Sequence, residues 1–214
     1  MTHLARLERD ALCATLDAVG PAAPTLCSPW TSADLAAHLV LRDRRPDLTP
    51  GIWVPALAAR TEQGMRRYAA MPWSDLVDLV RAGPPAWSPA RLAAVDDLVN
   101  FVEFFVHHED LLRGNELSGP RRELSARESA GLWKSLSRSA RLMFRRSPVG
   151  VVLKTPAGAT LTARPATGLG TVVLEGEPAE LLLAAYGRRR VAQLEVMGSD
   201  EAIDGLWSAP VGLS

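Results

Sequence analysis

The sequence VDDLVNFVEFFVHHEDLLR, Val95 to Arg113, decides how the chain is interpreted. Its centre, Leu98 to Val106, is apolar apart from Asn100 and Glu103, and a helix that is apolar almost all round lies inside a bundle. Glu103 and His107 are four residues apart, so they share one face of that helix. Asn100 continues this face upstream. The stretch therefore predicts a central helix that carries polar groups on one interior face.

A glutamate among apolar neighbours needs a partner. Burying an unpaired carboxylate costs several kcal/mol, so Glu103 should be protonated, ion-paired or bound to a metal ion. A carboxylate and an imidazole at this spacing are ligands that zinc and similar divalent ions prefer. The alternative is that Glu103 and His107 hydrogen-bond each other or a nearby arginine, without a metal.

A second histidine, His38, lies among apolar residues in the middle of a predicted helix, after Asp34-Leu-Ala-Ala. Alone it would be interpreted as a core residue with a hydrogen-bond partner. Beside an interior Glu/His pair it becomes the third ligand, and two histidines with one glutamate are typical of catalytic zinc, which keeps one position open. Arg42, one turn further on, could hold a substrate carboxylate through two hydrogen bonds, or it could form a surface ion pair.

Hydrophobic periodicity divides the chain near Pro148. Residues 1–146 predict a helical bundle, and residues 149–214 a small α+β module, so the expected class is α+β. In the first part, helices are expected over 3–18, 32–44, 54–70, 74–82, 89–113 and 125–145, with capping boxes at Thr31–Asp34 and Ser125–Glu128. In the second part, strands are expected over 149–154, 160–164, 171–175 and 191–197, and helices over 178–186 and 199–206.

Composition gives no reason to expect nucleic acid or a membrane as a partner. The 214 residues include 24 Lys plus Arg and 24 Asp plus Glu, so no overall charge favours nucleic acid or an anionic membrane. Apolar runs fall far short of the roughly 20 residues of a membrane helix, and the N-terminus lacks the apolar core of a signal peptide. The two cysteines, Cys13 and Cys27, make a disulfide framework unexpected and favour a cytoplasmic location.

Four segments resemble the mycothiol-dependent maleylpyruvate isomerase family of actinobacterial metal-binding proteins. They are CSPWTSADLAAHLVLRDRRP (27–46), RAGPPAWSP (81–89), NFVEFFVHHEDLLR (100–113) and VVLEGEPAELLLAAYGR (172–188). The resemblance implies a DinB-like helical bundle followed by a sterol-carrier-like α+β domain. It also implies that a histidine of the second helix and a Glu-x-x-x-His pair bind zinc. These residues correspond to His38, Glu103 and His107, the set reached above.

We expect a metalloenzyme that uses a low-molecular-weight thiol to act on a small electrophilic substrate, by S-transfer or cis–trans isomerisation. Neither cysteine is an obvious nucleophile, so the thiol would be a co-substrate, and the resemblance implies mycothiol. Candidate catalytic residues are Arg42, Asp34 and Asn100, and Arg42 and Trp87 could bind the thiol, although Trp87 could equally be core or a loop anchor. The alternatives are a metal-dependent hydrolase with Asp34 or Glu109 as base, and a metal-dependent binding module that is not an enzyme.

Overall fold

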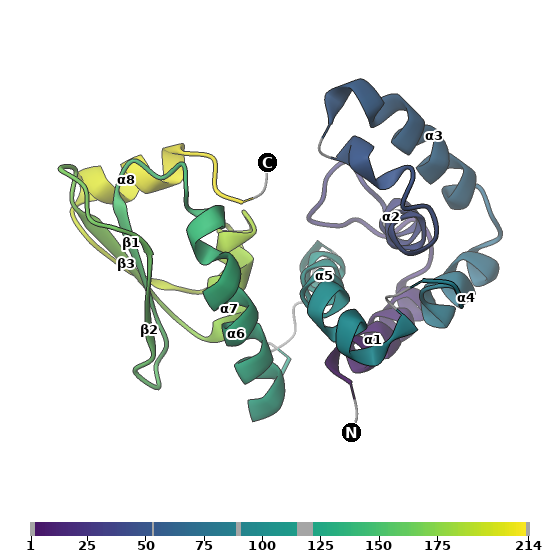
Figure 1. Cartoon of the computed structure of the whole chain (residues 1–214), viewed down its shortest axis with the longest axis horizontal. Coiled ribbons are helices and arrows are strands. Elements are labelled where there is room, and N and C mark those ends of the chain that lie inside the picture. The colour runs from purple at the N-terminus through teal and green to yellow at the C-terminus, as the bar shows by residue number, and fades with distance from the viewer. Residues whose placement is uncertain (1–2, 53, 89–90, 115–121, 213–214) are drawn as a thin grey trace. The chain divides into compact units, whose positions relative to one another are not determined.

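The chain forms two compact units, Met1–Arg121 and Arg122–Ser214, which are described separately (Figure 1). The computed structural model describes residues 3–52, 54–88, 91–114 and 122–212. The class is mixed α+β, as predicted, with a helical first unit and a sheet in the second. Within the described residues, no helix is both long and apolar enough to cross a lipid bilayer.

The first unit is a helical bundle around the long helix α5. Its elements are α1 (Leu4–Val19), α2 (Ser32–Arg44), the 3-10 turns Thr49–Ile52 and Pro55–Leu57, α3 (Ala58–Ala69), α4 (Trp73–Ala82) and α5 (Ala93–Gly114). Helix α1 packs along α5, while α2 packs against α3 and α4. The aromatic rings of Phe104 and Phe105 are fully buried, which confirms that the apolar stretch lies in the interior.

Local signals set the ends of two helices as predicted. Thr31 Oγ1 accepts a hydrogen bond from the Asp34 N–H, and the Asp34 carboxylate accepts one from the Thr31 N–H at 2.9 Å, which confirms the capping box of α2. The box at Ser125 and Glu128 is present in the same form. Helix α3 starts at Ala58, later than the predicted residue 54, because the 3-10 turn at Pro55–Leu57 takes up the first residues.

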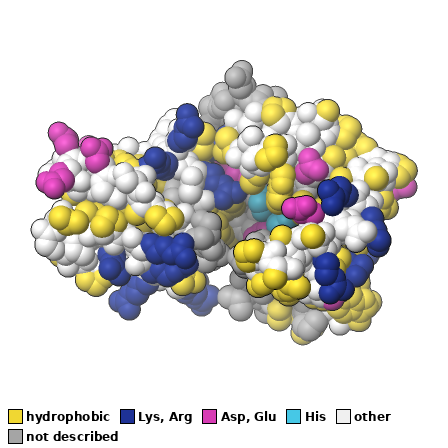
Figure 2. All heavy atoms as spheres, turned by 90° about the horizontal axis from the view of Figure 1, so that it is seen from above, with side chains coloured by type: hydrophobic (Ala, Val, Ile, Leu, Met, Phe, Trp, Pro, Cys, Tyr) yellow, Lys and Arg dark blue, Asp and Glu magenta, His cyan; other side chains and the backbone are white. Residues whose placement is uncertain are grey.

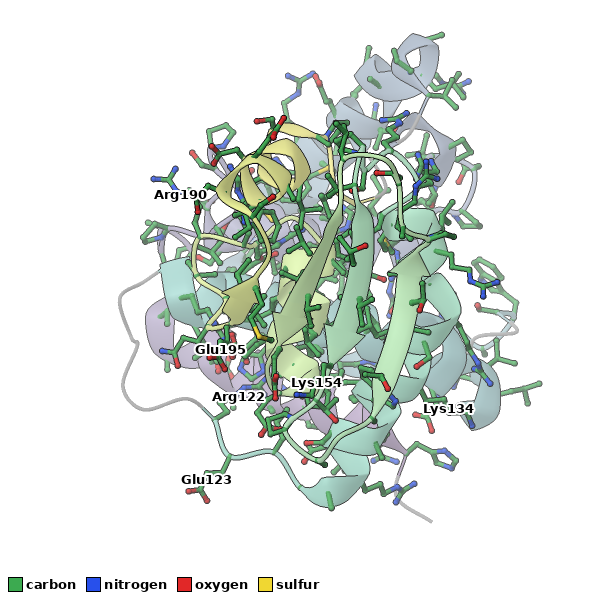
Figure 3. The ribbon with its side chains drawn as sticks, turned by 90° about the vertical axis from the view of Figure 1, so that its left-hand side faces the viewer. Arg122, Glu123, Lys134, Lys154, Arg190 and Glu195 are labelled. Carbon is green, nitrogen blue, oxygen red and sulfur yellow. The ribbon has the colours of Figure 1, made fainter. Side chains whose placement is uncertain are left out.

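Over residues 122–212, the second unit combines a four-stranded sheet with three helices. They are α6 (Ala126–Met143), β1 (Gly150–Lys154), β2 (Thr160–Arg164), β3 (Thr171–Glu175), α7 (Pro178–Ala185), β4 (Glu195–Met197) and α8 (Asp200–Ser208). The strand order is β2-β1-β3-β4, with β1 and β3 parallel and the outer pairs antiparallel. Lys154 and Glu195, labelled in Figure 3, lie on β1 and β4 in register with Glu175 of β3, and Lys154 Nζ donates to Glu175 at 2.9 Å.

The position of α6 differs from the sequence-based division. Residues 125–145 were expected in the bundle with a boundary after residue 146, whereas α6 packs against α7 and β2 in the second unit. Its buried stripe, Leu132, Leu136, Ala140 and Met143, has ordinary helical spacing. Such a stripe shows that a helix has a buried face but not which partner covers it, so periodicity alone misplaced the boundary.

Candidate metal centre

Three side chains from two helices bring their ligand atoms together in the first unit. His38 comes from α2, and Glu103 and His107 come from α5. His38 Nε2 lies 3.1 Å from Glu103 Oε1, and His107 Nε2 lies 3.2 Å from the same oxygen. One ligand atom of each residue lies within 4.8 Å of the other two. The structure therefore groups the three predicted ligands into one cluster, called the HEH cluster below.

The two histidines present their Nε2 atoms to this cluster. The ring of His38 packs against Trp30, with 5.1 Å between the ring centroids, and its Nδ1 is buried with no hydrogen-bond partner among the described residues. The side chains of His38 and His107 are 7% and 10% exposed, while that of Glu103 is 23% exposed. Figure 2 shows histidine side chains at the surface beside hydrophobic and acidic ones. The cluster is thus mostly buried but open to solvent at the glutamate.

The spacing of these atoms suits a small divalent ion. Zinc binds imidazole nitrogen and carboxylate oxygen at about 2.0–2.2 Å, so tetrahedral ligand atoms are about 3.3 Å apart. The two nitrogen–oxygen distances of 3.1 and 3.2 Å are close to this value. Two neutral imidazoles and one carboxylate also provide the charge and ligand types of a catalytic zinc site.

The groups around the cluster favour an ionised Glu103 carboxylate paired with a protonated His107. Burial alone would raise the pKa of Glu103, but hydrogen bonds and charges of His107, His38 and Arg42 outweigh it, so the pKa lies well below the usual value. Burial would lower the pKa of His107, but its hydrogen bonds to Asp110, Cys27 and Glu103 raise it well above the usual value. Burial lowers the pKa of His38, which stays neutral. Without a metal, His107 therefore carries the proton.

A chain of polar contacts leads from the cluster to Arg9 of α1. Arg42 Nε lies 3.4 Å from Glu103 Oε1, and Arg42 Nη1 donates to Asn100 Oδ1 at 3.1 Å. Asn100 in turn donates to Asp96 Oδ1 at 2.8 Å, and Arg9 Nη2 donates to both Asp96 oxygens at 2.8 and 2.7 Å. Arg42, whose side chain is 16% exposed, is therefore held beside the cluster by Glu103 and Asn100. Asn100 is buried and orients it.

The other candidate residues have different surroundings. The Asp34 carboxylate is engaged by Thr31 in the helix cap, and Glu109 is paired with Arg113 at 2.7 Å. Trp87 is 65% exposed in the segment between α4 and α5, so it is not a core residue. The roles proposed for Asp34 and Trp87 stay predictions.

The neighbouring histidine, His108, points to another part of the bundle. Its Nδ1 lies 2.7 Å from Glu8 and its Nε2 lies 2.8 Å from Thr15, both residues of α1. Helix geometry turns adjacent residues by about 100°. His108 therefore ties α5 to α1, and only His107 faces the cluster.

Two residues that the sequence did not assign lie behind His107. Its Nδ1 is 3.0 Å from Asp110 Oδ2, and Cys27 Sγ donates to the same oxygen over 3.1 Å. Asp110 is three residues after His107, so helical spacing could have suggested this contact. Cys27 lies in the loop before α2, and nothing in its local sequence connects it with α5.

Asp43 is a partly buried carboxyl group close to the same polar chain. Burial raises its pKa from 3.8 to about 6, and the charges of Arg9 and Arg42 only partly oppose this. Since the folded pKa is the higher one, folding favours the protonated form, and that contribution is lost as the pH rises through about 6. We expect Asp43→Asn to raise the free energy of unfolding at neutral pH by roughly 1–2 kcal/mol. In urea denaturation, the gain in unfolding free energy should shrink when the pH is lowered from neutral to below 3.8, the unfolded pKa. An equal gain at neutral pH and at that low pH would contradict the raised pKa of Asp43 as its cause.

The chain was compared with protein families, curated proteins and solved structures, and only solved structures gave a match. No protein-family model matches the chain, and no curated protein sequence matches it. Among solved structures, the crystal structure of the mycothiol-dependent maleylpyruvate isomerase aligns with a TM-score of 0.60 and 17% identity, covering 90% of each chain. The chain has the fold of this isomerase. A histidine-to-alanine mutant of the same enzyme aligns with a TM-score of 0.58 and 16% identity, also over 90% of each chain.

The likeness to the isomerase concerns both units. An alignment that covers 90% of the chain must include residues of the helical unit and of the sheet-containing unit. The resemblance seen in the sequence is therefore supported as a likeness of fold, and at 17% identity it goes no further.

Proposed function

We propose that this chain is a metal-dependent enzyme that uses a low-molecular-weight thiol of the mycothiol type as co-substrate. The reaction would be S-transfer to, or cis–trans isomerisation of, a small electrophilic substrate. The observation that carries the proposal is the HEH cluster, in which two imidazole nitrogens face one carboxylate oxygen at 3.1 and 3.2 Å. The fold of a mycothiol-dependent isomerase supports the thiol as the partner molecule.

His38, Glu103 and His107 would hold the metal, for which zinc fits the donor set best. A divalent ion with an open coordination position lowers the pKa of a thiol that binds to it and so supplies a thiolate at neutral pH. Arg42, held by Asn100 and 16% exposed, would bind a carboxylate or another anionic group of the substrate beside the cluster. Exposed Trp87 remains a candidate for contact with the thiol co-substrate.

Hydrolysis is the less favoured of the enzymatic alternatives. It needs a free base near the metal, and the two candidates, Asp34 and Glu109, are engaged by Thr31 and Arg113. A shell filled by four protein ligands would favour a binding module without turnover, because an enzyme needs an exchangeable position. Among the described residues, the cluster groups only three ligand side chains, which favours an exchangeable position.

The affinity for zinc should depend on pH. His107 holds a proton in the metal-free protein, because its pKa is raised, and zinc must displace that proton. We therefore expect zinc affinity to increase as the pH rises through the raised pKa of His107, where the imidazole loses its proton. Competition with a chromophoric chelator at each pH measures this. An affinity that does not change with pH would contradict the protonated state of His107.

The test of the thiol is a titration of the cobalt-substituted protein with mycothiol and with simple thiols. A sulfur-to-metal charge-transfer band, together with turnover that requires the thiol, is the expected result. Turnover that ignores every thiol would favour the hydrolase instead. Arg42→Gln should keep the metal and the thiol band but weaken binding of an anionic substrate, whereas Arg45→Gln, an exposed arginine paired with Asp47, serves as the matched control.

A further inference from the structure

We infer that Asp110 and Cys27 form an orienting pair that directs Nε2 of His107 toward the metal and thereby sets the metal affinity. This inference rests on the proposed function, because it concerns a ligand of the HEH cluster. The two ring nitrogens of His107 face different carboxylates. Nε2 faces Glu103 at 3.2 Å, and Nδ1 faces Asp110 at 3.0 Å.

Asp110 determines which nitrogen can bind a metal. A neutral imidazole carries one proton, and the nitrogen that binds a metal must be the other one. The Asp110 side chain is completely buried, and its carboxylate can only accept a hydrogen bond from Nδ1–H. The proton is thus kept on Nδ1 and the lone pair on Nε2. Carboxylate partners of this kind also make the ligand more basic and fix the ring orientation.

Cys27 fixes the carboxylate in turn. Its Sγ donates to Oδ2 of Asp110, the same oxygen that accepts from His107. The backbone of the loop is attached at the same place, since the Leu26 N–H donates to the Asp110 carbonyl at 3.0 Å. A Cβ on Gly114 would lie 2.5 Å from Cα of Thr25, so this loop touches the backbone of α5 directly. The position of Cys27 is therefore fixed relative to α5.

The same loop contacts both histidine ligands. Cys27 contacts His107 both directly and through Asp110, and Trp30, three residues later, packs on the His38 ring. Cys27 groups with His107 and Asp110, and its Sγ shares Oδ2 of Asp110 with Nδ1 of His107. Its effect on the metal would therefore pass through the orientation of His107, and it acts as a positioning residue.

The experiment compares zinc affinities of the full chain and its variants by competition with a chromophoric chelator. Asp110→Asn should weaken zinc binding about 10- to 100-fold, as is usual for partners of metal ligands. Cys27→Ala should weaken it less, and Cys27→Ser should restore the affinity because a hydroxyl can donate to the same oxygen. Glu8→Gln is the matched control, since it alters the carboxylate partner of His108, which faces away from the cluster. Cys13→Ala controls for loss of a cysteine elsewhere.

A second measurement reports the tautomer directly. Long-range proton–nitrogen NMR correlations of the zinc-loaded protein should show His107 protonated at Nδ1, and Asp110→Asn should make that proton exchange faster with solvent. Unchanged zinc affinity in both Asp110→Asn and Cys27→Ala, while the wild type binds one zinc, would overturn this inference alone. A wild type that binds no zinc would overturn the proposed function as well. If Asp110→Asn does not fold, the Ala and Ser variants of Cys27 decide the question.

Discussion

Replacing His107 with alanine is expected to abolish stoichiometric zinc binding. The substitution removes one of three ligands and leaves Glu103 without the imidazole that faces it at 3.2 Å. Loss of a partner of a ligand already costs about 10- to 100-fold in affinity, so loss of the ligand itself should exceed about 100-fold. His38→Ala should have the same effect, because it removes the only ligand from α2 within the described cluster. Metal analysis of the purified, dialysed variants measures this.

His108→Asn is the matched control for both histidine variants. It is adjacent to His107 and also buried, but its ring nitrogens contact Glu8 and Thr15. This variant should be less stable than the wild type and yet keep one zinc per folded chain. Full zinc occupancy in both His107→Ala and His38→Ala would refute the site, and loss of zinc in all three variants would indicate a general effect of destabilisation.

Replacing Arg9 with methionine should give the largest loss of stability. Arg9 and Asp96 form an ion pair in which both side chains are about nine-tenths buried, with exposures of 8% and 10%. Its guanidinium also lies over the Phe104 ring, 4.9 Å from the centroid. Methionine keeps much of the packing but leaves the Asp96 carboxylate buried without its cation. Removing one partner of a buried pair typically costs about 3–5 kcal/mol, so we expect a loss in this range.

The control for this prediction is Arg6→Met on the same helix. Arg6 faces Asp10 at 4.0 Å with both side chains mostly exposed, and such surface pairs contribute little. Urea denaturation of both variants should show a large decrease for Arg9→Met and little change for Arg6→Met. A similar loss of unfolding free energy in the two variants would contradict the idea that burial makes the Arg9–Asp96 pair important. Asp96→Asn on its own should also destabilise, because it leaves Arg9 as the unpaired charge.

Local sequence was sufficient for much of the fold. Helical periodicity predicted α1, α2, α4 and α5 to within a few residues, because the spacing of apolar side chains is a property of each segment alone. Both capping boxes were confirmed, since each depends on residues three apart. In the same way, the four-residue spacing of Glu103 and His107 was enough to put them on one face of α5.

Contacts between distant segments could not be derived in this way. Arg42 was expected to bind either a substrate or a surface partner, and only packing shows that it contacts Asn100, 58 residues away. Cys27 and Asp110 are separated by 83 residues, and no local pattern connects them. The unit to which α6 belongs was missed for the same reason, because an apolar stripe is compatible with any apolar partner.

By itself, the sequence determined the helices, their caps and the interior face of α5 that carries Glu103 and His107. The tertiary structure decided how His38, 65 residues from Glu103, approaches it, which nitrogen of His107 faces the cluster, and what lies behind that ring. The physical reason is that backbone hydrogen bonds and side-chain spacing act within one segment. The direction of a ring or a guanidinium depends instead on the side chains that surround it once the helices have packed.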